Sequence, residues 1–138
     1  LVFDPIQIYK IFDRHNIDIV DDDIANGWRT VSKRELNYNN IVEGVTEYLY
    51  NPAPCCCLYN PDRDRHDYLV EKVKNTNADG VLFWYVNFCE PDAFDTPQLK
   101  ARLKSEDIPT TSIDIELTMT NFDAIETRIN ALSEMLGG

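Results

Sequence analysis

Four cysteines are the side chains of this sequence with the clearest capacity for chemistry, and Cys89 stands apart from the other three. It ends a near-continuous apolar run over residues 80–88 and directly precedes an acidic segment that begins with Glu90. A cysteine in this place could bind a metal or cluster, act as a nucleophile, or fill the core as a small apolar residue. Helix N-terminal amides favour a thiolate, whereas nearby acidic residues oppose a free one. We therefore expect Cys89 to be a ligand, with a core role as the alternative.

The consecutive cysteines Cys55, Cys56 and Cys57 are harder to combine with Cys89 in one site. In an extended segment adjacent side chains point to opposite faces, and cluster motifs separate their cysteines by two or more residues. The sequence therefore predicts a structural role for the triplet. A complete four-cysteine site within the chain is the lesser alternative.

Other reactive residue types lack partners at a useful spacing. His15 and His66 have no cysteine or histidine at metal-ligand spacing, so we expect them at the surface. The run Asp21-Asp22-Asp23 could bind a hard cation, but a solvated acidic loop is the simpler interpretation. The sequence contains no pattern that indicates a Ser-His-Asp triad, no Walker loop and no Gly-x-Gly-x-x-Gly motif.

The length and composition are those of a single soluble globular domain. The chain has 138 residues, 43% of them hydrophobic and 27% charged, with a net charge of −11. Such an acidic chain is a poor match for nucleic acid, whose binding depends on basic residues that neutralise phosphate. No apolar run is long enough to span a bilayer, so no membrane association is expected. The irregular cysteine spacing and the lack of any Asn-x-Ser/Thr acceptor indicate a reducing, cytoplasmic compartment.

Helical and strand patterns alternate along the chain and must position these residues. The apolar run before Cys89 predicts a strand buried on both faces, at the centre of a parallel sheet. We expect a single α/β domain over residues 1–138, with a three-layer, mainly parallel sheet of about four strands of the flavodoxin or Rossmann-like kind, its first strand truncated. The predicted strands are 17–20, 80–88 and 111–115, with an extended segment at 55–59. The predicted helices are 5–14, 39–50, 60–75, 95–105 capped by Asp95, and a final one capped by Thr120.

The segment Asn87-Phe88-Cys89-Glu90-Pro91 resembles the Lys-Phe-Cys-Asp-Pro motif of the 2-hydroxyacyl-CoA dehydratase family, which includes the ATP-dependent benzoyl-CoA reductase subunits. The similarity to the C-terminal domain of that family, as in component D of 2-hydroxyglutaryl-CoA dehydratase, continues along nearly the whole chain. The further matching segments are, in order, Asp4-Pro5, residues 20–23 with 27–29, residues 79–81, residues 94–100, Ile108-Pro109, residues 127–129 and residues 134–136.

This resemblance implies a third domain of a three-domain subunit, whose first strand lies just before Leu1. Family subunits pair as heterodimers, and each holds an oxygen-sensitive 4Fe-4S cluster near the domain interface. Carried over, Cys89 is one cluster ligand, and the remaining ligands come from the preceding domains. Cys55, Cys56 and Cys57 are then not needed for the cluster.

The resemblance also implies the reaction and its partners. In the family, an ATP-dependent iron–sulfur activator transfers one electron to the dehydratase cluster. That electron reaches the thioester carbonyl of an acyl-CoA, the resulting ketyl radical expels the neighbouring hydroxyl, and the electron is recovered. The domain by itself is expected to be inactive. Asn87 and Glu90 replace the Lys and Asp of the motif, and Glu126 and Leu132 replace a common Gln and Phe. The alternatives are a benzoyl-CoA reductase-type subunit and a non-catalytic α/β interaction domain in which Cys89 belongs to the core.

Overall fold

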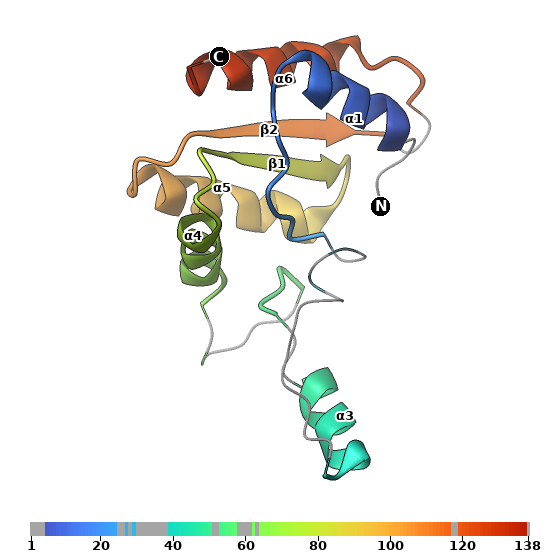
Figure 1. Ribbon diagram of the computed structural model, residues 1–138, viewed down its shortest axis with the longest axis vertical. Helices are drawn as coiled ribbons and strands as arrows, with labels where there is room; N and C mark the ends of the chain where they lie inside the picture. The colour runs from blue at the N-terminus through green and yellow to red at the C-terminus, as the bar shows by residue number, and fades with distance from the viewer. Residues whose placement is uncertain are drawn as a thin grey trace.

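The computed structural model describes residues 5–24, 27, 29, 39–50, 53–57, 62, 64–116 and 119–137. Helices and strands alternate in its C-terminal half, as predicted from the sequence, and the chain is an α/β protein (Figure 1). The elements are α1 (Pro5–Arg14), α3 (Ile41–Tyr50), α4 (Arg65–Thr76), β1 (Val81–Val86), α5 (Glu90–Lys104), β2 (Thr110–Ile115) and α6 (Asp123–Met135).

The sheet that the described residues form has two strands, β1 and β2, which run parallel. Val81 lies opposite Thr110 at one end of the register and Val86 lies opposite Ile115 at the other. Parallel neighbours need a crossover, and α5 provides it. The central run is predicted from the sequence to be buried on both faces, but all six β1 residues are only partly buried. A four-stranded Rossmann-like sheet is not present among the described residues.

Two apolar cores lie on opposite faces of this sheet. Successive β1 residues, such as Leu82 and Phe83, face different cores because side chains along a strand point alternately to its two faces. The first core joins α1 and α6 to β2 and contains Ile8, Ile11, Phe12, Ile113, Ile115, Ile125 and Ile129. The second joins α4 to α5 and contains Leu69, Val70, Val73, Leu99 and Leu103. Figure 1 shows α1 and α6 on one side of the strands and α4 and α5 on the other.

The predicted strand at 17–20 is wrong. The helix before it ends as predicted, with Asn16 in a left-handed conformation at φ 52°. Residues 17–24 beyond it have no regular secondary structure and pair with no described strand. Ile19 and Val20 are 52% and 59% exposed. β-branched residues favour a strand only where a neighbouring strand offers ladder hydrogen bonds, and no described strand does so here, although Ile17 packs against the core beside α1.

Helix α5 begins six residues earlier than predicted, with Cys89 rather than Asp95 at its N-cap. Pro91 fits the first turn, where a missing N–H costs nothing, and Glu90 and Asp92 complement the helix dipole there. The Asp95 carboxylate therefore does not cap a helix; it is used in an ion pair. At α6, Phe122 is the N-cap and the predicted cap by Thr120 is wrong.

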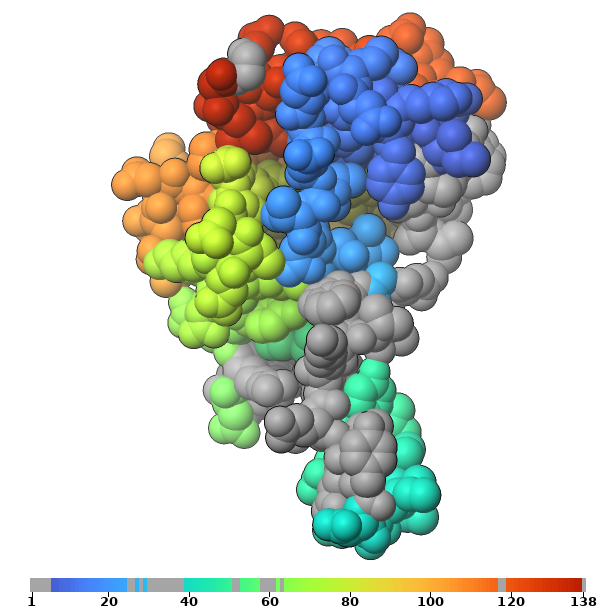
Figure 2. All heavy atoms as spheres, in the orientation of Figure 1, coloured from blue at the N-terminus to red at the C-terminus, as the bar shows by residue number. Residues whose placement is uncertain are grey.

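Helix α3 projects away from the two cores (Figures 1 and 2). Its predicted apolar face is exposed: Ile41 is 72% and Leu49 67% accessible. Gly44 is its only buried residue. Among the described residues, no helix is long and apolar enough to cross a membrane.

Candidate metal centre

Cys89 lies in the short connection between β1 and α5, at the carboxyl edge of the sheet. Its backbone N–H donates to Val86 O at 3.0 Å, and its carbonyl accepts from Ala93 N at 3.0 Å. The preceding residue, Phe88, is left-handed at φ 68° and fully exposed. A left-handed non-glycine residue is unfavourable unless the surroundings enforce it, and such residues gather at functional sites. The tight turn therefore fixes the Cys89 backbone at the start of a helix.

The Cys89 thiol is hydrogen-bonded to the first turn of α5. Its Sγ donates to Asp92 Oδ2 at 3.2 Å. The backbone N–H of Asp92 lowers the pKa of Cys89, but the Asp92 carboxylate outweighs this effect and raises that pKa above its ordinary value. The helix N-terminus and the acidic neighbour thus oppose each other, as expected from the sequence. The thiol is half-buried.

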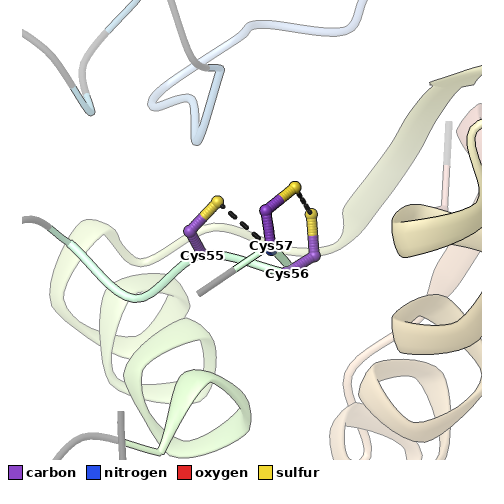
Figure 3. Close-up of side chains that lie close together, drawn as sticks. All are labelled: Cys55, Cys56 and Cys57. Carbon is purple, nitrogen blue, oxygen red and sulfur yellow. Dashed lines mark hydrogen bonds between the residues drawn. The ribbon is translucent and has the colours of Figure 1, made fainter. Parts of the chain in front are cut away.

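The consecutive cysteines come together in space (Figure 3). The Sγ atoms of Cys55, Cys56 and Cys57 all lie within 4.8 Å of one another. Cys56 Sγ and Cys57 Sγ are 3.8 Å apart, and Cys57 N donates to Cys55 Sγ at 3.5 Å. Cys55 and Cys56 are half-buried and Cys57 is exposed. We refer to these three residues as the cysteine triad, and the triad could hold a metal ion.

The extended conformation predicted for the triplet is therefore wrong. Cys55 makes an isolated bridge, but Cys56 and Cys57 form a turn. A turn rotates successive side chains to the same side of the backbone, which an extended strand cannot do. Convergence of the three sulfurs follows from this local conformation.

Asp92 connects the cysteine triad to Cys89. Its Oδ1 accepts from Cys56 Sγ at 3.1 Å, while its Oδ2 accepts from Cys89 Sγ. Burial and this carboxylate raise the pKa of Cys56 far above its ordinary value. Burial also raises the pKa of Cys55, but the Cys57 N–H and the Arg29 guanidinium lower it below its ordinary value overall. One carboxylate thus touches a thiol of each group, a contact that the sequence did not indicate.

A partly buried ion-pair network contacts the cysteine triad and the backbone that precedes it. Arg65 Nη1 binds Asp23 at 2.8 Å and its Nε binds Asp95 at 2.7 Å. The same Nη1 donates to Pro54 O at 2.9 Å, directly before the triad. Arg29 binds Asp23 at 2.6 Å and lies 3.4 Å from Cys55 Sγ. The network therefore joins the acidic run, α4 and α5 to the backbone that carries the cysteines.

The acidic run is consequently not a solvated loop. Asp21 pairs with Lys72 at 2.6 Å, and Asp23 pairs with two arginines. The carboxylates of Asp21 and Asp23 are therefore used in ion pairs, and no cation is needed to balance their charge. The histidines are half-buried rather than at the surface: His15 lies 3.4 Å from Glu126, and His66 lies 3.1 Å from an Asp64 oxygen.

A 4Fe-4S cluster, which the resemblance implies, can be compared with this donor set. Each iron of such a cluster takes one thiolate, so the cysteine sulfurs of one cluster lie farther apart than two thiolates on a single ion. Cys89, held at the sheet edge, can supply one such thiolate. The cysteine triad is too tightly grouped to supply three. The described residues are therefore compatible with one cluster ligand at Cys89 and do not by themselves provide a complete cluster site.

Comparison with known proteins identifies the family of this chain. Residues 2–136 match the family model described as 2-hydroxyglutaryl-CoA dehydratase, D-component. The (R)-phenyllactyl-CoA dehydratase beta subunit of Clostridium sporogenes is 34% identical over 99% of this chain and 36% of its own length. The lactoyl-CoA dehydratase subunit beta of Anaerotignum propionicum is 24% identical over 99% of this chain and 37% of its length. A benzoyl-CoA reductase subunit of Thauera aromatica is 24% identical over 76% of this chain and 28% of its length. The chain spans little more than a third of the length of the two dehydratase subunits and less than a third of the reductase subunit. It belongs to the 2-hydroxyglutaryl-CoA dehydratase D-component family.

Proposed function

We propose that this chain is part of an iron–sulfur 2-hydroxyacyl-CoA dehydratase, a lyase that removes water from a 2-hydroxyacyl-CoA to give the 2-enoyl-CoA. The family match over residues 2–136 supports this proposal. So do the names of the relatives, which are phenyllactyl-CoA and lactoyl-CoA dehydratases. The two names specify different acyl groups, so we propose the reaction class.

Cys89 is the residue that we propose as a ligand of the 4Fe-4S cluster. The observation that carries this proposal is its position: a half-buried thiol in the turn between β1 and the N-terminus of α5. In α/β proteins, ligands bind outside the carboxyl ends of the strands, often against a helix N-terminus. Bound there, the cluster would supply the single electrons that the dehydration needs.

In this proposal the residues of this chain bind the cluster through Cys89 and orient that ligand. Cys89 would lose its proton on binding iron, and the free amides at the start of α5 would stabilise the resulting thiolate. The hydrogen bond that Asp92 now accepts from Cys89 would then be broken. Its backbone N–H, which already lowers the Cys89 pKa, favours the thiolate form. Asp92 is thus positioned to influence the electronic environment of the ligand, as residues next to metal ligands do.

We further propose the setting of the whole protein from the same resemblance. The chain would be the C-terminal α/β domain of a larger subunit, with a Rossmann-like sheet completed by strands beyond the two described. Its partners would be the preceding domains, a second dehydratase subunit, an ATP-dependent iron–sulfur activator and the acyl-CoA, in the cytoplasm. The relatives' names support a place in a multi-subunit complex, since each relative is called a subunit.

A benzoyl-CoA reductase-type subunit is the second candidate, favoured by the match to the Thauera aromatica reductase. The experiment that separates the two is anaerobic turnover by the full subunit with its partner, the activator and ATP. Candidate substrates are phenyllactyl-CoA, lactoyl-CoA, 2-hydroxyglutaryl-CoA and benzoyl-CoA, with products identified by mass spectrometry. We expect an enoyl-CoA product lighter by one water from at least one hydroxyacyl-CoA. Reduction of benzoyl-CoA without any dehydration would overturn the proposal in favour of the second candidate.

A further inference from the structure

We propose that the cysteine triad is a second metal site, distinct from the cluster ligand Cys89, and that it takes one soft, thiophilic cation of the Zn²⁺ or Cd²⁺ class. Nothing in the dehydratase reaction requires such a site. The inference rests on the placement of the three sulfurs and on the groups around them.

The sulfur–sulfur distances suit one ion. Two thiolates bound tetrahedrally to one zinc, each with a bond of about 2.3 Å, lie about 3.8 Å apart. Cys56 Sγ and Cys57 Sγ are already 3.8 Å apart without a metal. Cys55 Sγ lies within 4.8 Å of both. Closing the triad around one cation therefore needs only a small movement of one side chain.

The surroundings hold the triad in this conformation. Arg65 fixes the carbonyl of Pro54, the residue before Cys55, and is itself held by two carboxylates. Arg29 Nη1 lies 3.4 Å from Cys55 Sγ. Three thiolates and one divalent cation carry a net charge of −1, or −2 with a carboxylate as the fourth ligand, and the adjacent Arg29 guanidinium offsets part of that charge. Preorganisation of this kind reduces the entropy lost on binding.

Asp92 is placed to complete the coordination. Structural zinc sites almost always have four ligands, and zinc accepts a carboxylate oxygen beside thiolates. Asp92 Oδ1 is 3.1 Å from Cys56 Sγ, so it borders the position that a metal on the triad would occupy. On metal binding the thiol protons leave to solvent and the Cys56–Asp92 hydrogen bond is replaced by coordination. The exposed Cys57 leaves a path for the ion to enter.

The test is a Cd²⁺ titration of the full chain, purified anaerobically, reduced and free of zinc. Stoichiometry is read by native mass spectrometry, and the number of thiolates bound to cadmium by cadmium NMR and the ultraviolet charge-transfer band. We expect one Cd²⁺ per chain on three thiolates. Cys56→Ser and, separately, the exposed Cys57→Ser should each weaken binding by roughly tenfold or more, and Asp92→Asn should weaken it less.

Cys89→Ser is the matched control, and iron content is measured beside cadmium. The proposal expects Cys89→Ser to keep the Cd²⁺ site. Loss of cadmium in Cys89→Ser, or unchanged cadmium in both triad variants, would overturn it. So would the absence of a one-to-one complex in the reduced wild-type chain. Iron binding that survives Cys89→Ser would instead contradict the cluster assignment and leave the triad result unaffected, so the two proposals fail separately.

Discussion

Arg65 is the residue whose loss should disturb both the fold and the cysteine triad. Its guanidinium contacts Asp23, Asp95 and the Pro54 carbonyl, and its side chain is only 16% exposed. Burial lowers the pKa of Arg65, but the two carboxylates raise it above its ordinary value, so the side chain stays charged. Arg65→Met keeps the aliphatic stem and removes the charge and all three hydrogen bonds.

The expected cost follows from what each partner retains. Asp23 keeps Arg29 at 2.6 Å, so its carboxylate is not left alone. Among the described residues Asp95 keeps His66 Nε2 at 3.6 Å as its partner, and the carboxylate is 18% exposed. Removing one partner of a buried pair costs about 3–5 kcal/mol. Because these groups are not fully buried and Asp23 stays paired, we expect the lower end, about 3 kcal/mol.

Urea denaturation followed by circular dichroism measures this loss. With a slope of about 1–3 kcal/mol per molar urea, a loss of that size lowers the midpoint by roughly 1–3 M. Arg14→Met is the matched control, because the Arg14–Glu126 pair is 52% and 37% exposed. Exposed pairs contribute little, so this variant should leave the midpoint unchanged. Equal midpoints for the two variants would show that the network around Arg65 does not stabilise the fold.

Two other predictions concern the core and the pH dependence of folding. Leu103→Ala should destabilise the protein by about 2–5 kcal/mol in urea, because Leu103 is fully buried between α4 and α5. Leu49→Ala, at a residue 67% exposed on α3, should change stability by less than about 0.5 kcal/mol. Hydrogen bonds from Lys74 and Arg102 lower the pKa of Glu106 to about 2, so its contribution to stability is complete above pH 4.5 and is lost as the pH falls through about 2. Lys74→Ala should raise that pKa toward 4.5 in a carboxyl NMR titration, and an unchanged value would contradict the assignment.

The elements that the sequence predicts best are those whose pattern and surroundings agree. The helix over 5–14 and the strand near 111–115 lie within one residue of their predicted bounds, because periodicity and burial point the same way there. The 17–20 segment is not a strand because strand formation depends on a neighbour that local composition does not reveal. The spacing from Asp95 to Gln98 fits a capping box, but a partner distant in sequence, Arg65, binds the Asp95 carboxylate instead.

The candidate site follows from the sequence in part. Placing Cys89 between a strand and a helix needs only the apolar run and the acidic segment after it, and the structure has that arrangement. The convergence of the triad does not follow, because an apolar triplet is expected to be extended, whereas the residues turn after Cys55. Two nearby prolines, Pro52 and Pro54, are the local sign of irregular backbone. The role of Asp92 depends on tertiary contact over 36 residues of sequence, which no local pattern encodes.

We propose that Cys89 holds iron and that the cysteine triad does not. The most direct measurement is the iron content and Mössbauer spectrum of the anaerobically purified full subunit with its partner, for wild type, Cys89→Ala and Cys57→Ala. We predict a four-iron spectrum in wild type and in Cys57→Ala, and a loss of iron in Cys89→Ala. A Cys89→Ala protein with the full iron content and an unchanged spectrum would contradict the account.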